Sequence, residues 1–130
     1  MVRIAAAMAL AGHGLIHLIG FVVPWGIATV DGFPYRTTAL AGALDLGDVA
    51  ARAVGIVWLV CAVGFVVAGI GVMRRATWAV PLTAALATLS IAVCVLGLPE
   101  TAAGIAVNAA ILAVAGWISF ARGRTAVVER

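Results

Sequence analysis

Four long runs of apolar residues dominate the chain, and short polar segments separate them. The runs cover about residues 4–23, 50–73, 76–98 and 102–120. A transmembrane helix needs about 20 consecutive apolar residues to cross the hydrocarbon core of a bilayer. Each run has close to that length, so the pattern predicts a single domain, an all-α integral membrane bundle of four transmembrane helices.

The longest polar connection covers residues 24–49 and is expected to join the first two helices outside the membrane. It begins with turn residues and aromatic side chains at 31–36. The following segment 40–44 is apolar, which predicts that the loop folds back on the bundle. Asp48 is expected to cap the second transmembrane helix, because a side-chain oxygen at that position satisfies free backbone N–H groups.

The composition supports a membrane protein and excludes several other classes. Apolar residues make up 65% of the chain, charged residues only 10%, and the mean hydropathy is +1.23. Soluble domains are roughly half apolar and a quarter charged, so the lipid bilayer is the expected partner. The net charge of +3 comes from arginines in flanks and loops, without a basic stripe, and nucleic acid is therefore not an expected partner.

The arginines also predict the orientation in the membrane. Positive residues are enriched on the cytoplasmic side, and an N-in/C-in topology puts six arginines inside and two outside. The inner set is Arg3, Arg74, Arg75, Arg122, Arg124 and Arg130, and the outer set is Arg36 and Arg52. All basic residues are arginine, and alanine, glycine and valine abound, as in GC-rich bacteria. We therefore expect a multi-pass protein of a bacterial plasma membrane.

Two histidines are the strongest candidates for chemistry. His13 and His17 lie four residues apart in the first apolar run, so they share one face of a helix. Ionisable residues inside a membrane are functional-site hypotheses by default. The alternative is that each ring hydrogen-bonds to a neighbouring helix and only fastens the bundle. The spacing alone does not choose between the two.

The depths of the other polar residues favour a site. Counted along the helices, Asn108, Ser90 and Cys94 fall in the same outer half of the membrane as the histidines, together with Thr88 and Cys61. This clustering predicts an outward-facing polar pocket beneath the long loop. Its candidate ligand-binding residues are His13, His17, Asn108 and Ser90. Separate interhelical hydrogen bonds would be the simpler explanation of the same pattern.

A metal ion is one occupant to consider. His13, His17 and Cys94 would make a soft ligand set for zinc or copper. Two histidines alone are too few for a structural site, and buried cysteines more often serve as packing residues. Haem is less favoured, since two histidines on one helical face cannot hold opposite faces of one haem. The sequence identifies no cofactor.

Three functions remain open, and catalysis is the least favoured. The chain has no paired intramembrane carboxylates, no Ser-His-Asp set and no phosphate loop. The first hypothesis is a binding or transport-related protein for a metal ion or small ligand. The second is a structural or accessory subunit of a homo-oligomer or larger membrane complex. The third, weaker, is a quinone-dependent membrane oxidoreductase.

The segment GHGLIHLIGF at residues 12–21 resembles the first helix of a group of small bacterial four-helix membrane proteins. Further similarities are the G-x-x-WL segment at 55–59 and the G-x-x-x-N pattern at 104–108, which follows the acidic turn at Pro99 and Glu100. The architecture is more distantly similar to that of DoxX-like proteins. The resemblance implies a four-helix membrane fold and draws attention to the histidines and Asn108. It implies no activity.

Overall fold

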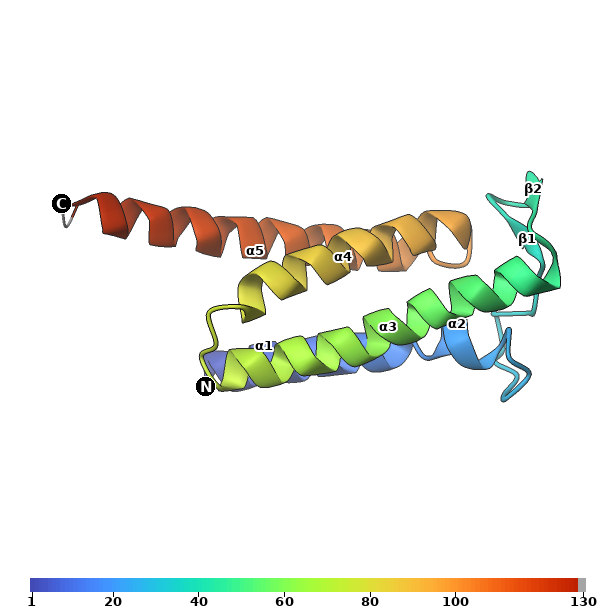
Figure 1. Cartoon of the computed structure of the whole chain (residues 1–130), viewed down its shortest axis with the longest axis horizontal. Helices are drawn as coiled ribbons and strands as arrows, with labels where there is room; N and C mark the ends of the chain where they lie inside the picture. Colours follow the sequence, from blue (N-terminus) through green and yellow to red (C-terminus); the bar gives the residue numbers. More distant parts are fainter. Residues whose placement is uncertain (129–130) are drawn as a thin grey trace.

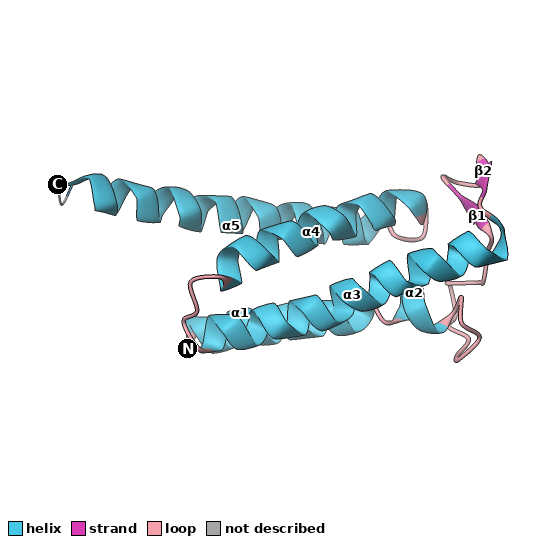
Figure 2. Ribbon diagram, viewed as in Figure 1, coloured by secondary structure: helices cyan, strands magenta, loops and turns pink. Residues whose placement is uncertain are grey.

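The computed structural model describes residues 1–128 and consists almost entirely of helices (Figures 1 and 2). A short two-stranded hairpin lies between the second and third helix. The elements are α1 (Val2–Ile16), α2 (Ile19–Val22), β1 (Thr38–Ala39), β2 (Leu44–Asp45), α3 (Gly47–Met73), α4 (Ala79–Leu96) and α5 (Ala102–Val128). The predicted inner residues Glu129 and Arg130 lie outside the described residues.

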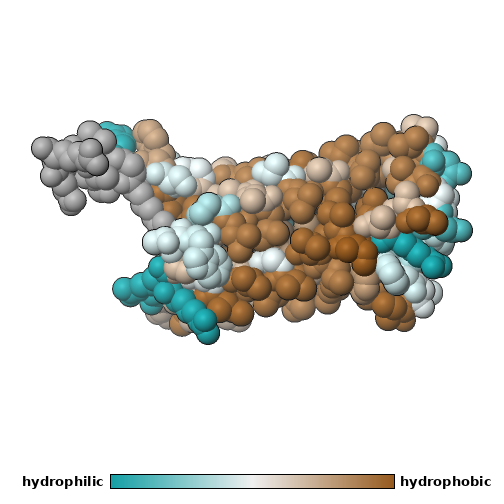
Figure 3. All heavy atoms as spheres, in the orientation of Figure 1, coloured by the Kyte–Doolittle hydropathy of each residue, from teal (hydrophilic) through white to brown (hydrophobic). Residues whose placement is uncertain are grey.

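Within residues 1–128, four helical segments are long and apolar enough to cross a membrane. They are Val2–Val22, which combines α1 and α2, then Gly47–Met73, Ala79–Leu96 and Ala102–Ala121. Most side chains of each segment face outward, and Figure 3 shows a broad apolar band with hydrophilic residues gathered toward its two ends. This distribution suits a lipid solvent, and the predicted all-α bundle with four helices able to cross a membrane is confirmed.

The helices form two layers. In Figure 1, α1 and α3 lie side by side below α4 and α5, and α3 also packs on α4. Both ends of the described chain lie at one end of the bundle, and the hairpin lies at the other. The buried core between the layers contains Cys61, Phe65 and Ala68 from α3, with Leu86 and Ala87 from α4.

Glycines allow α1 and α3 to approach closely. A Cβ atom on Gly14 would lie 2.7 Å from the carbonyl oxygen of Ala62, and one on Gly69 would lie 2.9 Å from that of Ala7. Both distances are shorter than any normal contact between a Cβ and a backbone atom. Association of helices in lipid relies on such close packing, because burial of apolar surface supplies no drive there.

The first apolar run is not one regular helix. The N–H of His17 bonds to the carbonyl of Gly14 at 3.0 Å, and that of Leu18 bonds to Leu15 at 3.1 Å. These bonds span three residues instead of four, so the helix tightens into a 3₁₀ turn before α2 begins. The expected continuous helix 4–23 is therefore wrong in this detail, although its length across the membrane is retained.

Two hydrogen bonds tie the hairpin to the end of α4. The N–H groups of Leu40 and Ala41 donate to the carbonyls of Leu96 and Leu98, at 3.0 and 3.1 Å. Carbonyls at a helix C-terminus have no partner within the helix. The Leu40 N–H therefore satisfies the carbonyl of Leu96 at the end of α4, and the Ala41 N–H satisfies the carbonyl of Leu98 beyond it. Leu40 and Ala41 adopt left-handed φ angles of 53° and 56° to present these N–H groups.

Three expected details differ in the structure. Asp48 does not cap α3, because the helix already begins at Gly47. The N–H of Gly47 instead donates to Asp45 Oδ1 at 3.0 Å. The third transmembrane helix begins at Ala79, after a turn at 74–78. The last helix continues to Val128 instead of ending at Phe120, since the following residues contain no proline and the single glycine, Gly123, disfavours a helix only mildly.

Candidate functional site

A hydrogen-bonded network joins α1 to both helices of the opposite layer. His13 Nε2 lies 3.1 Å from Asn108 Oδ1 in α5, and His17 Nε2 lies 2.6 Å from Ser90 Oγ in α4. The Asn108 amide closes the link, because its Nδ2 donates to Ser90 Oγ at 2.8 Å. His17, Ser90 and Asn108 are buried, and His13 is partly exposed. All four predicted ligand-binding residues therefore meet in one network.

The break in the first helix explains how His17 is held. Because the His17 N–H bonds to Gly14, the carbonyl of His13 is left without its usual helical donor. The side chain of His17 replaces that donor, with Nδ1 lying 2.8 Å from the His13 carbonyl oxygen. The two rings meet edge to face, with centroids 4.6 Å apart. The 3₁₀ turn thus fixes the orientation of the His17 ring.

The carbonyl partners determine the direction of every bond in the network. A carbonyl oxygen only accepts, so His17 carries a proton on Nδ1. In the neutral ring, Nε2 then accepts the Ser90 hydroxyl proton. Asn108 Nδ2 donates to the Gly104 carbonyl as well as to Ser90, which orients the amide. Asn108 Oδ1 then accepts from Nε2–H of His13. Neutral His13 is left with a bare Nδ1.

That bare nitrogen is not fully buried. Among the described residues, every buried side-chain nitrogen or oxygen has a hydrogen-bond partner. His13 Nδ1 has no partner in the network, so it cannot be one of the buried atoms. His13 also lines the main cavity of the molecule. The network therefore leaves one hydrogen-bond acceptor available to a bound molecule.

The cavity occupies the hairpin end of the bundle and has a volume of about 280 Å³. It extends from His13 in α1 and His17 directly after it to the loop residues before β1 and the turn before α5. Its walls are mainly apolar and include side chains from every helix: Ile16, Ile19, Val54, Trp58, Val93 and Ala103. Binding sites for small molecules combine apolar walls with a few placed polar groups in this way.

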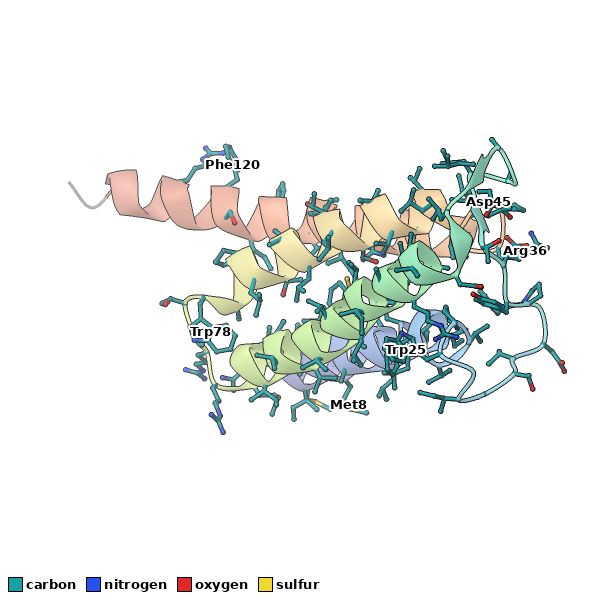
Figure 4. The ribbon with its side chains drawn as sticks, turned by 45° about the vertical axis from the view of Figure 1, so that its right-hand side comes forward. Met8, Trp25, Arg36, Asp45, Trp78 and Phe120 are labelled. Atoms are coloured by element: carbon teal, nitrogen blue, oxygen red, sulfur yellow. The ribbon has the colours of Figure 1, made fainter. Side chains whose placement is uncertain are left out.

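An ion pair lies at the margin of the cavity. Arg36 Nη1 in the loop and Glu100 Oε1 in the α4–α5 turn are 2.8 Å apart, and both residues line the cavity. The Arg36 side chain is half exposed. Figure 4 shows Arg36 and Asp45 at the hairpin end, far along the molecule from Trp78. The pair links the loop to the α4–α5 turn, two segments that are distant in sequence.

A second contact fastens the loop to α3. The Tyr35 hydroxyl donates to Asp48 Oδ1 at 2.5 Å, and this hydrogen bond to a carboxylate raises the pKa of Tyr35 above its ordinary value. Tyr35 also lines the cavity. The residue expected to cap α3 therefore positions the loop over the site instead.

The predicted metal ligands are close together but differently engaged. Cys94 Sγ lies 4.0 Å from Ser90 Oγ, within reach of the network. Both ring nitrogens of His17 are already hydrogen-bonded. No group of three or more His, Cys, Asp or Glu side chains in residues 1–128 has the spacing of a metal site. Cys61 is buried in the core and lies outside the network, and Thr88 bonds only to its own helix.

Several residues of the cavity escaped the sequence analysis. Trp58 packs against His17 with ring centroids 5.2 Å apart, and Thr101 Oγ1 donates to the Cys94 carbonyl at 2.5 Å. Arg36 and Glu100 were identified as loop charges and not as partners. A signal existed for Trp58, since a tryptophan in the middle of a membrane helix does not belong to the interfacial belt.

Comparison of the chain with protein families, with curated proteins and with solved structures found no match. The resemblance of residues 12–21 to small bacterial membrane proteins accordingly stays a prediction. The proposal of a function therefore depends on the geometry of the site.

Proposed function

We propose that this membrane protein binds a small, uncharged organic molecule in the cavity at the hairpin end, with His13 Nδ1 as the hydrogen-bond acceptor. The observation that carries this proposal is the pairing of a mostly apolar cavity with one unused acceptor. Such a site selects a molecule with an apolar body and a single hydrogen-bond donor. The proposed function is binding of this molecule, whether or not the protein then passes it to another protein.

The occupied donors and acceptors of the network narrow the ligand class. Ser90, Asn108 and both nitrogens of His17 are used within the protein. A strongly polar ligand would find few partners, and a desolvated polar group without a partner costs about 1–3 kcal/mol. The Arg36–Glu100 pair has both signs of charge satisfied, so a charged ligand would gain little there. A neutral amphiphile is favoured.

A metal ion is less well supported than an organic ligand. To bind a metal, His17 would have to release either the His13 carbonyl or the Ser90 hydroxyl. The bare nitrogen of His13 provides one ligand, whereas a zinc site needs three or four. The metal hypothesis would regain weight if purified protein held stoichiometric zinc or copper that the His13→Phe variant lost.

The proposed setting is a bacterial plasma membrane with both chain ends in the cytoplasm. The excess of arginines at the end that contains Arg3, Arg74 and Arg75 supports this orientation. The cavity would then open toward the periplasmic leaflet. Reporter fusions at residue 130 and in the loop at residue 31 would test this orientation, because only the fusion at residue 130 should report a cytoplasmic location.

Phenol and toluene form a matched pair of probes for the proposed site, since they differ by a hydroxyl in place of a methyl group. Trp58 reports on the cavity once Trp25, Trp78 and Trp117 are changed to phenylalanine. In nanodiscs, we expect phenol to change the Trp58 fluorescence at two- to tenfold lower concentration than toluene. That ratio is about the net effect of one hydrogen bond.

Three variants make the experiment decisive. His13→Phe should abolish the preference for phenol while toluene still binds. Val54→Phe fills the cavity without adding a second tryptophan and should abolish both signals, whereas Val60→Phe on the lipid-facing side of the same helix should change neither. Equal responses to the two probes in the parent would refute the role of His13. If neither probe binds saturably, the binding proposal is refuted. An accessory-subunit function, in which the polar residues only join helices, would then be favoured.

A further inference from the structure

A second, independent cavity lies at the opposite end of the molecule, between α1 and α3. It is a groove of about 270 Å³, and its lining contains no polar side chain: Ile4, Ala7, Met8, Ala11, Val66, Gly69, Ile70 and Met73. Small residues on both helices, Ala7, Ala11 and Gly69, form its floor. Larger exposed residues such as Met8 and Ile70 form its rims, and Figure 4 shows Met8 extending away from the bundle.

Three arginines lie around one end of this groove. Ile4 and Met73 line that end because α1 and α3 run in opposite directions. In the sequence, Arg3 directly precedes Ile4, and Arg74 and Arg75 are the two residues after Met73. All three arginines are exposed, and none forms a salt bridge with a carboxylate of the described residues. Figure 3 shows hydrophilic residues gathered at this end, next to the apolar band.

The turn at the end of α3 gives one of these arginines, Arg75, a left-handed backbone conformation. The N–H of Ala76 bonds to the Gly71 carbonyl at 2.9 Å and that of Arg75 to Val72 at 3.2 Å, which is the Schellman arrangement. Its left-handed position usually holds glycine, yet here Arg75 adopts it with a φ of 57°. The two hydrogen bonds that end α3 hold Arg75 in this conformation. Trp78, half exposed beside this turn, marks the headgroup level.

We propose that this groove binds an anionic phospholipid, with one acyl chain along α1 and α3 and the phosphate between Arg3, Arg74 and Arg75. A basic pocket between transmembrane helices is suited to an anionic headgroup, and the fully apolar groove is suited to its chain. A second copy of this chain fits less well. It would lie in the same membrane in the same orientation and would bring its own arginines to the same depth.

Lipid retention in native mass spectrometry tests the proposal. The protein is released from micelles that contain equal amounts of phosphatidylglycerol and phosphatidylcholine with identical acyl chains. We expect the parent to retain phosphatidylglycerol at least tenfold more often. Each arginine near an anionic phosphate contributes about a fivefold preference, so Arg3→Gln and Arg75→Gln should each lower it by about that factor. Arg52→Gln, at the hairpin end, is the matched control and should leave the preference unchanged.

Filling the groove separates the contribution of the chain from that of the charges. Ala11→Phe should reduce retention of both lipids at least threefold, whereas Ala9→Phe, on the exposed side of α1 away from the groove, should not. Equal retention of the two lipids by the parent, or a preference that survives both arginine changes, would overturn the proposal. So would a dimer in the parent that only Ala11→Phe dissociates, because the occupant would then be a second copy. Phenol binding at the other end is independent of each of these results.

Discussion

The first helix is joined to its neighbours in two different ways. Toward α3 it has a seam of glycines and alanines, in which Gly14 and Gly69 bring the backbones into contact. Toward α4 and α5 it has directed hydrogen bonds through His13 and His17. The first arrangement leaves no space between the helices near Gly14. The second spans a wider separation and leaves a cavity beside it.

The difference shows how a small membrane protein can combine rigidity with a hollow site. Close packing requires no particular chemical groups but demands a short distance between the helices, and it holds α1 and α3 together as one layer. Hydrogen bonds between side chains are strict in direction and can bridge helices whose backbones do not touch. The cavity at the hairpin end therefore lies where polar groups, and not glycines, join the two layers.

The glycine seam should be the more sensitive of the two. Gly14→Ala puts a methyl group 2.7 Å from the Ala62 carbonyl oxygen, whereas Gly12→Ala meets nothing within 4 Å. Overpacking of this kind lowers the free energy of unfolding by about 1–3 kcal/mol, and the Gly12 variant should lose nothing. Unfolding titrations with SDS in mixed micelles measure both. Equal losses would mean that α1 does not pack on α3 through this face.

The polar junction should yield a smaller loss that is shared among its members. Asn108→Leu removes the bonds to His13 and Ser90 and should lower the free energy of unfolding by about 1–2 kcal/mol, since hydrogen bonds between membrane helices contribute about 0.6 kcal/mol on average. His13→Phe added to Asn108→Leu should cost less than the two separate losses together. Strictly additive losses in the double-mutant cycle would contradict a shared network.

Breaking the ion pair at the cavity margin should affect access more than stability. Arg36→Gln or Glu100→Gln should lower the free energy of unfolding by less than about 1 kcal/mol, because the arginine is half exposed. We expect faster dissociation of phenol from the cavity in stopped-flow fluorescence, with the double variant no faster than either single one. Unchanged dissociation rates would separate this pair from the entrance to the site.

The smallest expected effect concerns the loop. Tyr35 is the single tyrosine of the chain, so the tyrosinate absorbance reports on it alone. Its pKa should lie above 10.0, and Asp48→Asn should return it toward that value. A raised pKa in the folded state means that the contribution to stability is complete below pH 10 and is lost as the pH rises through the folded-state pKa. Identical titrations of the two proteins would show that the contact is absent.

The sequence was sufficient for the helices and for the polar residues that could meet. Length and hydropathy predict four long apolar helices, and residues 1–128 contain four helices long and apolar enough to cross a membrane. The i, i+4 spacing placed His13 and His17 on one face, and counting along the helices placed Ser90 and Asn108 at similar depth. The structure brings these four together because depth and face together leave few alternatives in a bundle of four helices.

Other features depend on lateral packing, which a linear pattern does not encode. The 3₁₀ turn at His17 has no proline to announce it, and the glycines around it also allow a regular helix. The hairpin places left-handed φ angles at Leu40 and Ala41, where no sequence rule would expect them, because their N–H groups serve the end of α4. The pairing of Arg36 with Glu100 likewise follows from how the loop lies over the bundle.

The two histidines permit one direct measurement of the proposed site. Nitrogen-15 NMR of histidine-labelled protein in lipid bilayers would contain only two rings. Our account predicts opposite neutral tautomers, with the proton on Nδ1 in His17 and on Nε2 in His13, and a phenol-induced shift confined to Nδ1 of His13. Identical tautomers, or phenol shifts in the His17 ring alone, would contradict both the network and the binding site built on it.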